Sequence, residues 1–165
     1  MSAIFSEPPE SAAASAVADG SVTNQFVTFT CGNRAFGIEI MSVREIRSWS
    51  PTTPLPNQPF GAQGVLDIRG NIVEVYDLAS LLGAGGFDDG HAGKVVLVVS
   101  LPQAEVGIIV DSVSDIIFAR EDDMRPAPSQ GHGRNDGSVA GLVKNEDRLI
   151  AILSLPGLFP AYSLQ

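Results

Sequence analysis

The chain has 165 residues, 44% of them hydrophobic and 18% charged, so it can bury a core as one domain or as two very small ones. Its formal net charge of −9 argues against nucleic acid or an anionic membrane as a partner, because phosphate groups repel a surface of that sign. No stretch approaches the roughly 18 to 20 apolar residues that would insert across a bilayer, and a single cysteine, Cys31, excludes an internal disulfide and favours the reducing cytoplasm.

The first part of the chain predicts a tail followed by a hairpin. Residues 1–22 contain no lysine or arginine and are mainly alanine, serine, proline and acidic residues, which predicts a disordered tail. Residues 26–30 and 35–40 predict two strands joined by a turn with glycine and asparagine. Residues 42–45 have capping-box spacing, which suits a helical turn, but the β-branched residues there suit a continued strand equally well.

Residues 64–78 carry the pattern around which the rest is organised. Apolar residues alternate on either side of a break at Arg69-Gly70-Asn71. This predicts two half-buried strands and a tight turn in which the glycine and the asparagine supply positive φ angles. Asp77 stands where a helix N-cap would, residues 78–82 predict a short helix, and Gly83 predicts its end. An arginine on so rigid a turn indicates a contact surface.

Three segments predict connections rather than regular structure. Four prolines between residues 51 and 59 predict an extended connection that no helix could cross, and Trp49 is expected to pack it against the sheet. The glycine-rich residues 84–93 predict a flexible linker. Residues 119–137, rich in proline, glycine and charge, predict a long mobile loop.

The pattern of the first half starts again after the linker. At an offset of 70 residues, 37–46 aligns without gaps with 107–116, and five of the ten positions are identical. Residues 141–155 follow the apolar rhythm of 64–78, with an acidic turn and with Ser154 at the corresponding N-cap. The chain is therefore predicted to be an internal duplication of a β-unit with four or five short strands and one short helix.

Two such units are expected to pack together, because a unit of about 65 residues would be only marginally stable alone. Short antiparallel strands remove their exposed edges most easily by closing into barrels. The prediction is a mainly β domain over 23–160 with two barrels side by side. The first covers about 23–83, the second about 94–160, and residues 84–93 link them.

Few residues could carry catalysis or hold a cofactor. His91 and His132 lie in glycine-rich loops without a second ligand at metal spacing, which indicates exposed loop histidines. Cys31 stands at a strand end, and no serine lies in a Gly-x-Ser-x-Gly elbow. Residues 83–86 lack the Lys-Ser/Thr of a phosphate loop, and the acidic runs 88–89 and 121–123 lack the spaced oxygens of a calcium loop. The sequence predicts no enzyme, metal site or cofactor.

At residues 64–78 the sequence GVLDIRGNIVEVYDL resembles the G-V-x-x-L-R-G-x-V-x-P-V-x-D-L signature of CheW-like chemotaxis coupling domains. Three further segments fall in the family's order: Val43-Arg44-Glu45-Ile46, Val110-Asp111-Ser112-Val113 and Arg125-Pro126-Ala127-Pro128. The resemblance covers residues 25–159.

The resemblance implies a non-catalytic adaptor of two SH3-like five-stranded β-barrel subdomains with a few short helices. Such proteins couple the cytoplasmic tip of chemoreceptors (methyl-accepting chemotaxis proteins) to the regulatory domain of the histidine kinase CheA in two-component signal transduction. The protein would then be cytoplasmic and recruited to membrane-bound receptor arrays. Carried over by position, its receptor-binding residues are Val43, Glu45, Gly64 and Arg69; the kinase-binding residues stay unknown.

Plainer interpretations stand beside this one. Arg69 could form a salt bridge with Asp67 or Glu74, and the valine at position 43 could simply belong to the core. Glu74 replaces the family's usual proline and Ala79 an arginine that often follows, which bears on which receptor or kinase is preferred. The alternative function is a small-ligand-binding β-barrel sensor, which would need polar residues pointing inward, whereas these strands place apolar residues on one face.

Overall fold

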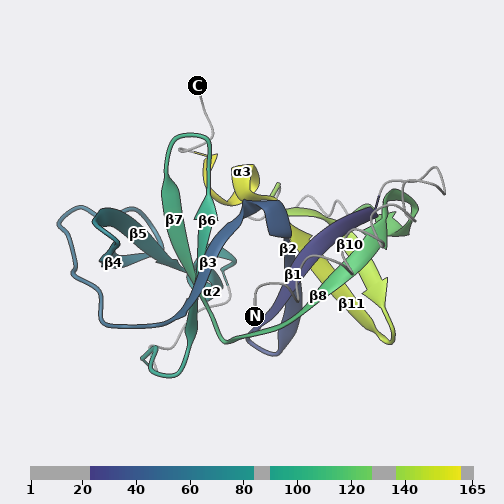
Figure 1. Cartoon of the computed structure of the whole chain (residues 1–165), viewed down its shortest axis with the longest axis horizontal. Coiled ribbons are helices and arrows are strands. Elements are labelled where there is room, and N and C mark those ends of the chain that lie inside the picture. The colour runs from purple at the N-terminus through teal and green to yellow at the C-terminus, as the bar shows by residue number, and fades with distance from the viewer. Residues whose placement is uncertain (1–22, 84–89, 128–136, 161–165) are drawn as a thin grey trace, which may run out of the picture.

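The structure, a computed structural model, describes residues 23–83, 90–127 and 137–160. Within these residues it is mainly β, with two sheets and a few short helices (Figure 1). The predicted tail (1–22), most of the predicted linker (84–89) and the part of the long loop that contains His132 lie outside the described residues.

The elements are short, as the spacing of the turn residues predicted. In chain order they are β1 (Thr23–Cys31), β2 (Arg34–Glu39), the 3₁₀ turn η2 (Ile40–Ser42), β3 (Val43–Ser48), β4 (Ala62–Ile68), β5 (Asn71–Asp77), α2 (Leu78–Leu81), β6 (Val95–Ser100), β7 (Glu105–Val110), β8 (Ser112–Arg120), the 3₁₀ turn η3 (Glu121–Asp123), β9 (Met124–Arg125), β10 (Val139–Asn145), β11 (Arg148–Leu153) and α3 (Leu155–Leu158).

Each sheet takes strands from both halves of the chain. One sheet has six strands in the order β8-β1-β2-β11-β10-β9, and the other has five in the order β3-β6-β7-β5-β4. In Figure 1 the five-stranded sheet lies on the left and the six-stranded sheet on the right. Neighbouring strands are antiparallel, except that β11 runs parallel to β2 and β5 runs parallel to β7. The predicted fold class, two SH3-like subdomains, is confirmed.

This exchange of strands corrects the predicted division into a first barrel over 23–83 and a second over 94–160. β1 and β2 pair with β8 and β11 of the second half, and β6 and β7 pair with β3 and β5 of the first. Alternating apolar residues show which face of a strand is buried, but they do not show which strand lies beside it. One sheet also has six strands rather than five, because the two-residue β9 joins its edge.

The two sheets repeat one topology, as the predicted duplication requires. Apart from β9, the order β8-β1-β2-β11-β10 corresponds strand by strand to β3-β6-β7-β5-β4. The aligned glycines Gly37 and Gly107 occupy equivalent places, each beside a parallel neighbour strand. A Cβ on Gly37 would lie 2.8 Å from Ile152 Cδ1, and one on Gly107 would lie 2.9 Å from Val96 Cγ1. Close packing explains why both units keep this glycine.

The hairpin of β4 and β5 closes with a different pair of residues from the predicted one. Positive φ angles belong to Arg69 (53°) and Gly70 (85°). Asn71 already pairs with Ile68 as the first residue of β5. Two-residue hairpin turns of type I′ need positive φ at both central positions, so the strand register assigns the first to arginine.

The predicted helix caps are confirmed. Asp77 Oδ2 accepts hydrogen bonds from Ser80 N at 3.3 Å and Ser80 Oγ at 2.9 Å, and Ser154 Oγ accepts one from Gly157 N at 3.2 Å. Gly83 follows α2 with a φ of 78°. At 42–45 the open question resolves in favour of the strand, since η2 ends at Ser42 and β3 begins at the next residue.

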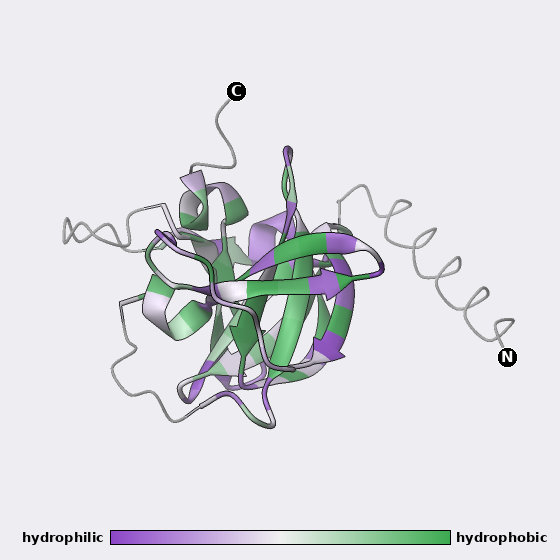
Figure 2. Cartoon of the chain, turned by 90° about the vertical axis from the view of Figure 1, so that its left-hand side faces the viewer, coloured by the Kyte–Doolittle hydropathy of each residue, from purple (hydrophilic) through white to green (hydrophobic). Residues whose placement is uncertain are grey.

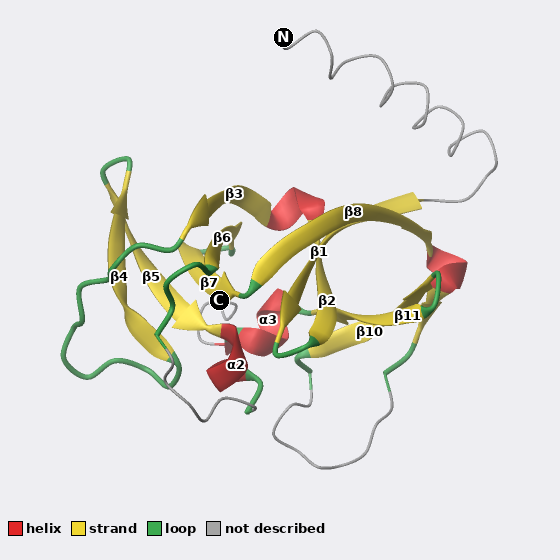
Figure 3. Cartoon of the chain, turned by 90° about the horizontal axis from the view of Figure 1, so that it is seen from below, coloured by secondary structure: helices red, strands yellow, loops and turns green. Residues whose placement is uncertain are grey.

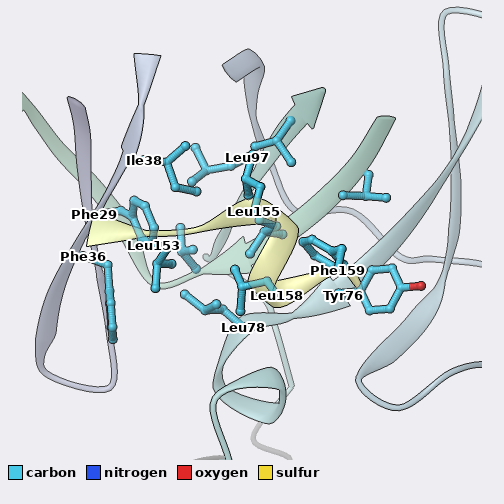
Figure 4. Close-up of a cluster of buried hydrophobic side chains, with 14 of the residues drawn as sticks. Phe29, Phe36, Ile38, Tyr76, Leu78, Leu97, Leu153, Leu155, Leu158 and Phe159 are labelled. Carbon is cyan, nitrogen blue, oxygen red and sulfur yellow. The ribbon is translucent and has the colours of Figure 1, made fainter. Parts of the chain in front are cut away.

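A shared hydrophobic core joins the two subdomains. It contains buried side chains of both sheets, such as Phe29 and Leu97, together with Leu78 of α2 and Leu155 of α3 (Figure 4). The short helices α2 and α3 lie near the junction of the two sheets when the molecule is seen from below (Figure 3). Each sheet also encloses a smaller apolar cluster of its own, and the hydrophobic residues concentrate along the strands (Figure 2). The subdomains therefore cannot separate without exposing the shared core.

Candidate functional site

Two of the four predicted receptor-binding residues touch each other. Arg69 Nη2 lies 2.9 Å from Glu45 Oε1. Glu45 is in β3, at one edge of the five-stranded sheet, and Arg69 is in the turn that joins β5 to β4 at the other edge. The ion pair therefore connects the two ends of a curved sheet and lies where that subdomain closes.

Arg69 pairs with neither of the partners that the composition offered. Asp67 Oδ1 instead accepts a hydrogen bond from Gly70 N at 3.0 Å, which supports the turn. Glu74 Oε1 accepts one from Tyr76 Oη at 2.9 Å. The partner of Arg69 lies 24 positions earlier in the sequence, and no local pattern indicates it.

The arginine remains accessible although it is paired. Its side chain is 75% exposed, whereas that of Glu45 is 22% exposed. Glu45 Oε2 also lies 3.7 Å from Arg47 Nη1, so the carboxylate is shared between two arginines. A guanidinium carries five N–H donors in a planar fork. Arg69 can therefore keep its contact with Glu45 and still donate hydrogen bonds to another protein.

Val43 lies on the same strand but is half-buried. It is the first residue of β3 and packs against the shared core. The ladder to β6 shifts between Val43, which faces Val99, and Glu45, which faces Val98. Such a bulge changes the direction of a side chain at the edge of a sheet. The plainer interpretation, that Val43 is a core residue, therefore holds for the buried part of its side chain.

Gly64 is buried and offers no surface to a partner. It has a φ of 122°, and a Cβ there would lie 2.6 Å from the backbone oxygen of Thr53. Thr53 and Val65 exchange two backbone hydrogen bonds of 2.9 Å each. Thr52 Oγ1 donates a further one to Gln63 O at 2.6 Å. Gly64 thus lets the proline-rich connection lie directly against β4.

His91 is not the exposed loop histidine that the sequence indicated. Its side chain is 15% exposed, its Nε2 lies 3.7 Å from Asp77 Oδ1, and its ring centroid is 5.8 Å from that of Trp49. Backbone hydrogen bonds from Lys94 N to His91 O and from Trp49 N to Lys94 O hold the end of the predicted linker against the domain. Trp49 itself packs on the apolar cluster of the five-stranded sheet.

The side chains that could have carried chemistry, Cys31 and the acidic run at 121–123, take part in the packing and hydrogen bonding of the fold. Burial, together with the carboxylates of Asp111 and Asp77, raises the pKa of the Cys31 thiol to about 11, so the thiol is protonated at neutral pH. Asp123 Oδ2 accepts a hydrogen bond from Arg120 N at 3.0 Å, which accounts for part of the acidic run at 121–123. Among the described residues no cluster of three or more His, Cys, Asp or Glu could hold a metal ion.

The sequence did not predict the exposed apolar residues on β8. Phe118 is 60% exposed and Ile116 is also exposed, on a strand at the edge of the six-stranded sheet. Between them Ile117 is buried. Side chains alternate between faces along a strand, so three consecutive apolar residues in β8 must leave at least one facing outward. The run Ile116-Ile117-Phe118 was the sequence signal that could have identified these exposed residues.

The comparisons with known proteins cover both subdomains. Residues 25–162 match the CheW-like domain family. The chain belongs to this family. It is 31% identical over 137 residues to "Chemotaxis protein CheW" of Rhizobium meliloti, covering 83% of this chain and 88% of that protein. It is 33% identical over 135 residues to "Probable chemotaxis protein CheW" of Rhizobium etli, covering 82% and 86%.

A solved structure agrees with the family assignment. The crystal structure of the scaffolding protein TtCheW from Thermoanaerobacter tengcongensis superposes with a TM-score of 0.75 at 27% identity, covering 84% of this chain and 93% of that one. Family and fold together support a chemotaxis adaptor. Within its described residues the chain has no helix with the length and apolar character needed to cross a bilayer.

Proposed function

We propose that this protein is a non-catalytic adaptor that couples chemoreceptors to the histidine kinase CheA in cytoplasmic, membrane-associated receptor arrays. The observation that carries the proposal is the exposed Arg69, held by Glu45 at the closure of the five-stranded subdomain. These residues stand at the positions that the family resemblance assigns to receptor contact. Membership of the CheW-like family supports the wider role.

The receptor-binding surface is centred on the Glu45–Arg69 pair. Ile46, the residue after Glu45 on β3, and Ile72, three residues after Arg69 on β5, are exposed as well. An exposed arginine with unused donors is typical of residues that anchor protein interfaces. Val43 contributes its exposed part, and Gly64 acts indirectly by positioning the connection over β4.

We propose that the kinase-binding surface lies on the other subdomain, along the edge strand β8. Ile116 and Phe118 are exposed there. The outer edge of β8 pairs with no other described strand. A strand edge with exposed apolar side chains suits a partner that is itself a β-barrel, as the resemblance implies for the CheA regulatory domain. The shared core would then connect the two surfaces to which the partners bind.

Such an adaptor needs no reaction of its own. It changes the activity of the kinase only if it binds one arrangement of its two partners more tightly than another. The buried polar residues among those described are Thr28 and Ser138. Subdomain interiors so poor in polar groups favour a scaffold over the alternative of a small-ligand sensor.

The receptor surface is tested by substituting Arg69→Glu and measuring binding to a purified receptor cytoplasmic fragment. We expect affinity to fall by about 2 kcal/mol or more, roughly 30-fold, because an anchor is lost and two carboxylates then face each other. Lys144→Glu makes the same charge change at an exposed site on β10 and should leave binding unchanged. Equal binding by the Arg69 variant would remove it from the site.

A charge swap distinguishes two roles of Arg69, direct contact with the receptor and closure of the subdomain. The double variant Glu45→Arg, Arg69→Glu restores an ion pair between the two edges of the sheet but leaves a carboxylate on the turn. If Arg69 contacts the receptor, binding stays weak in the double variant. Recovery of binding would contradict direct contact, because the pair would then act only through the shape of the subdomain.

The kinase-binding surface is tested by substituting Phe118→Ser and measuring binding both to the kinase regulatory domain and to the receptor fragment. This variant should lose binding to the kinase and keep binding to the receptor fragment, the reverse of Arg69→Glu. Phe60→Ser, at another exposed aromatic in the proline-rich connection, is the matched control. Loss of both partners in either variant, with the fold intact by circular dichroism, would contradict two separate surfaces.

A further inference from the structure

A groove of about 490 Å³ is lined by the β1–β2 turn and β2, by residues of β10 and β11, and by the chain just after α2. Leu82 and Leu142 contribute to its largely apolar lining. Leu149, also in the lining, is 61% exposed. The groove is separate from the Glu45–Arg69 pair and from the exposed residues of β8, so neither proposed surface accounts for it.

Two arginines give the groove its charge. Arg34 and Arg148 both line it and are exposed. The five ion pairs between described residues use other basic side chains, so neither arginine has an acidic partner within the described chain. Glu146 and Asp147 share a turn with Arg148 but are not part of the lining. The chain as a whole has 19 acidic and 10 basic residues, so this positively charged groove stands out from the rest of the surface. It favours the binding of a segment that carries carboxylates.

The chain carries a segment of matching chemistry outside the described residues. Residues 1–22 contain three acidic residues, Glu7, Glu10 and Asp19, and no lysine or arginine. Ile4 and Phe5 are adjacent, and Phe5 precedes the first carboxylate by two residues. An apolar pair followed by two carboxylates complements a groove with leucines in its lining and two arginines beside them.

The segment is long enough to reach. The groove lies at the Cys31 end of β1, so the path runs the length of that strand, roughly 26 Å at 3.3 Å per residue. Glu7 precedes Thr23 by 16 residues. A flexible chain of that length has a root-mean-square span of about 22 Å and can extend to about 50 Å. Tethering also raises the local concentration of the segment to the order of millimolar, so that weak contacts suffice.

We propose that residues 4–10 dock in this groove of the same chain. Ile4 and Phe5 cover the exposed Leu149, and the carboxylates of Glu7 and Glu10 pair with Arg34 and Arg148. The N-terminal segment then occupies a surface distinct from both proposed partner surfaces. Any protein that binds this groove must bring the same combination of apolar and acidic side chains and displace the segment.

The test is paramagnetic relaxation in the full-length protein. A nitroxide is attached to the Ser6→Cys variant at pH 7, where the buried Cys31 should react much more slowly than the introduced thiol. We expect the amide signals of Leu149 and Arg148 to lose at least about half of their intensity relative to the reduced label. Adding Arg34→Glu and Arg148→Glu should restore the intensities, whereas Lys144→Glu should not. Salt at 1 M should also restore them, because it screens exposed charges.

Three results would overturn the proposal. The groove signals could keep full intensity, or the double arginine variant, with a folded spectrum, could leave the broadening unchanged. Broadening could also occur only when labelled and isotope-enriched copies are mixed, which would assign the groove to the segment of a second copy. The experiment contains neither receptor nor kinase, so its failure leaves the proposed adaptor function intact.

Discussion

Arg69 adopts a backbone conformation that few residues other than glycine accept. A φ of 53° at an arginine costs about 1 kcal/mol. An ion pair with a side chain 75% exposed returns no more than about that amount, because water screens it. The turn therefore gains little stability from its arginine. Strain that an exposed ion pair at most offsets agrees with a residue kept for binding.

Cys31 gives a prediction that depends on pH. Its pKa is raised to about 11 by burial and by neighbouring carboxylates, compared with 9.0 for a free thiol. The unfolded chain therefore releases this proton at a lower pH than the folded chain does. The stability that the neutral thiol confers is complete below pH 9 and is lost as the pH rises from about 9 to 11.

Urea unfolding at pH 8 and at pH 10.5 measures this effect. The decrease in free energy of unfolding should be larger in the wild-type protein than in Cys31→Ala, which lacks the titrating group. Ellman's reagent at pH 8 should react slowly with the folded protein and rapidly in urea. A native thiol that reacts at the rate of free cysteine would contradict the burial.

The proline-rich connection is held to β4 at one position. Thr53 pairs with Val65 through two backbone hydrogen bonds, and Gly64 leaves room for the Thr53 carbonyl. Without a Cβ at Gly64, the connection crosses the sheet at backbone contact distance. This contact places β4, and hence the turn with Arg69, relative to the rest of the subdomain.

Substituting Gly64→Ala should destabilise the protein by about 2 kcal/mol or more, because it adds a collision with Thr53 to the cost of a φ of 122°. Gly70→Ala is the matched control: its φ of 85° is also positive, but nothing lies within 4 Å of the new Cβ, so the cost should be about 1 kcal/mol. Urea unfolding measures both. Equal losses in the two variants would contradict the role of the Thr53 contact.

Local rules predicted most elements of this fold. The N-caps at Asp77 and Ser154, the stop at Gly83 and the two strands around Arg69 follow from residues within a few positions of one another. The same rules misplaced the positive φ angles by one residue, because the pairing of Asn71 with Ile68 sets the turn. Register is decided between strands and is only partly visible within one of them.

At the scale of the whole molecule, the two subdomains are interwoven. Each sheet contains strands from both halves of the chain, and a shared core lies between the sheets. Neither half can therefore complete a sheet alone. The arrangement makes the two proposed partner surfaces parts of one cooperative unit rather than of two independent barrels.

Expressing residues 1–89 and 90–165 as separate fragments tests this arrangement. Alone, each fragment should lack a cooperative thermal transition, because its strands have lost their neighbours. Co-expressed, the fragments should elute together and melt cooperatively. Full-length protein cleaved at a protease site inserted within 84–89 is the control and should stay associated. A cooperative transition in either isolated fragment would contradict the interwoven topology.

The amino-acid sequence by itself determined most of the strands, the helix caps and the repeat of 37–46 in 107–116, because each of these depends on the pattern of neighbouring residues. Only the tertiary structure decided which strands pair, that Glu45 is the partner of Arg69, and that Gly64 is buried. These features join residues far apart in the chain, and such contacts leave no mark on the local alternation of apolar and polar side chains.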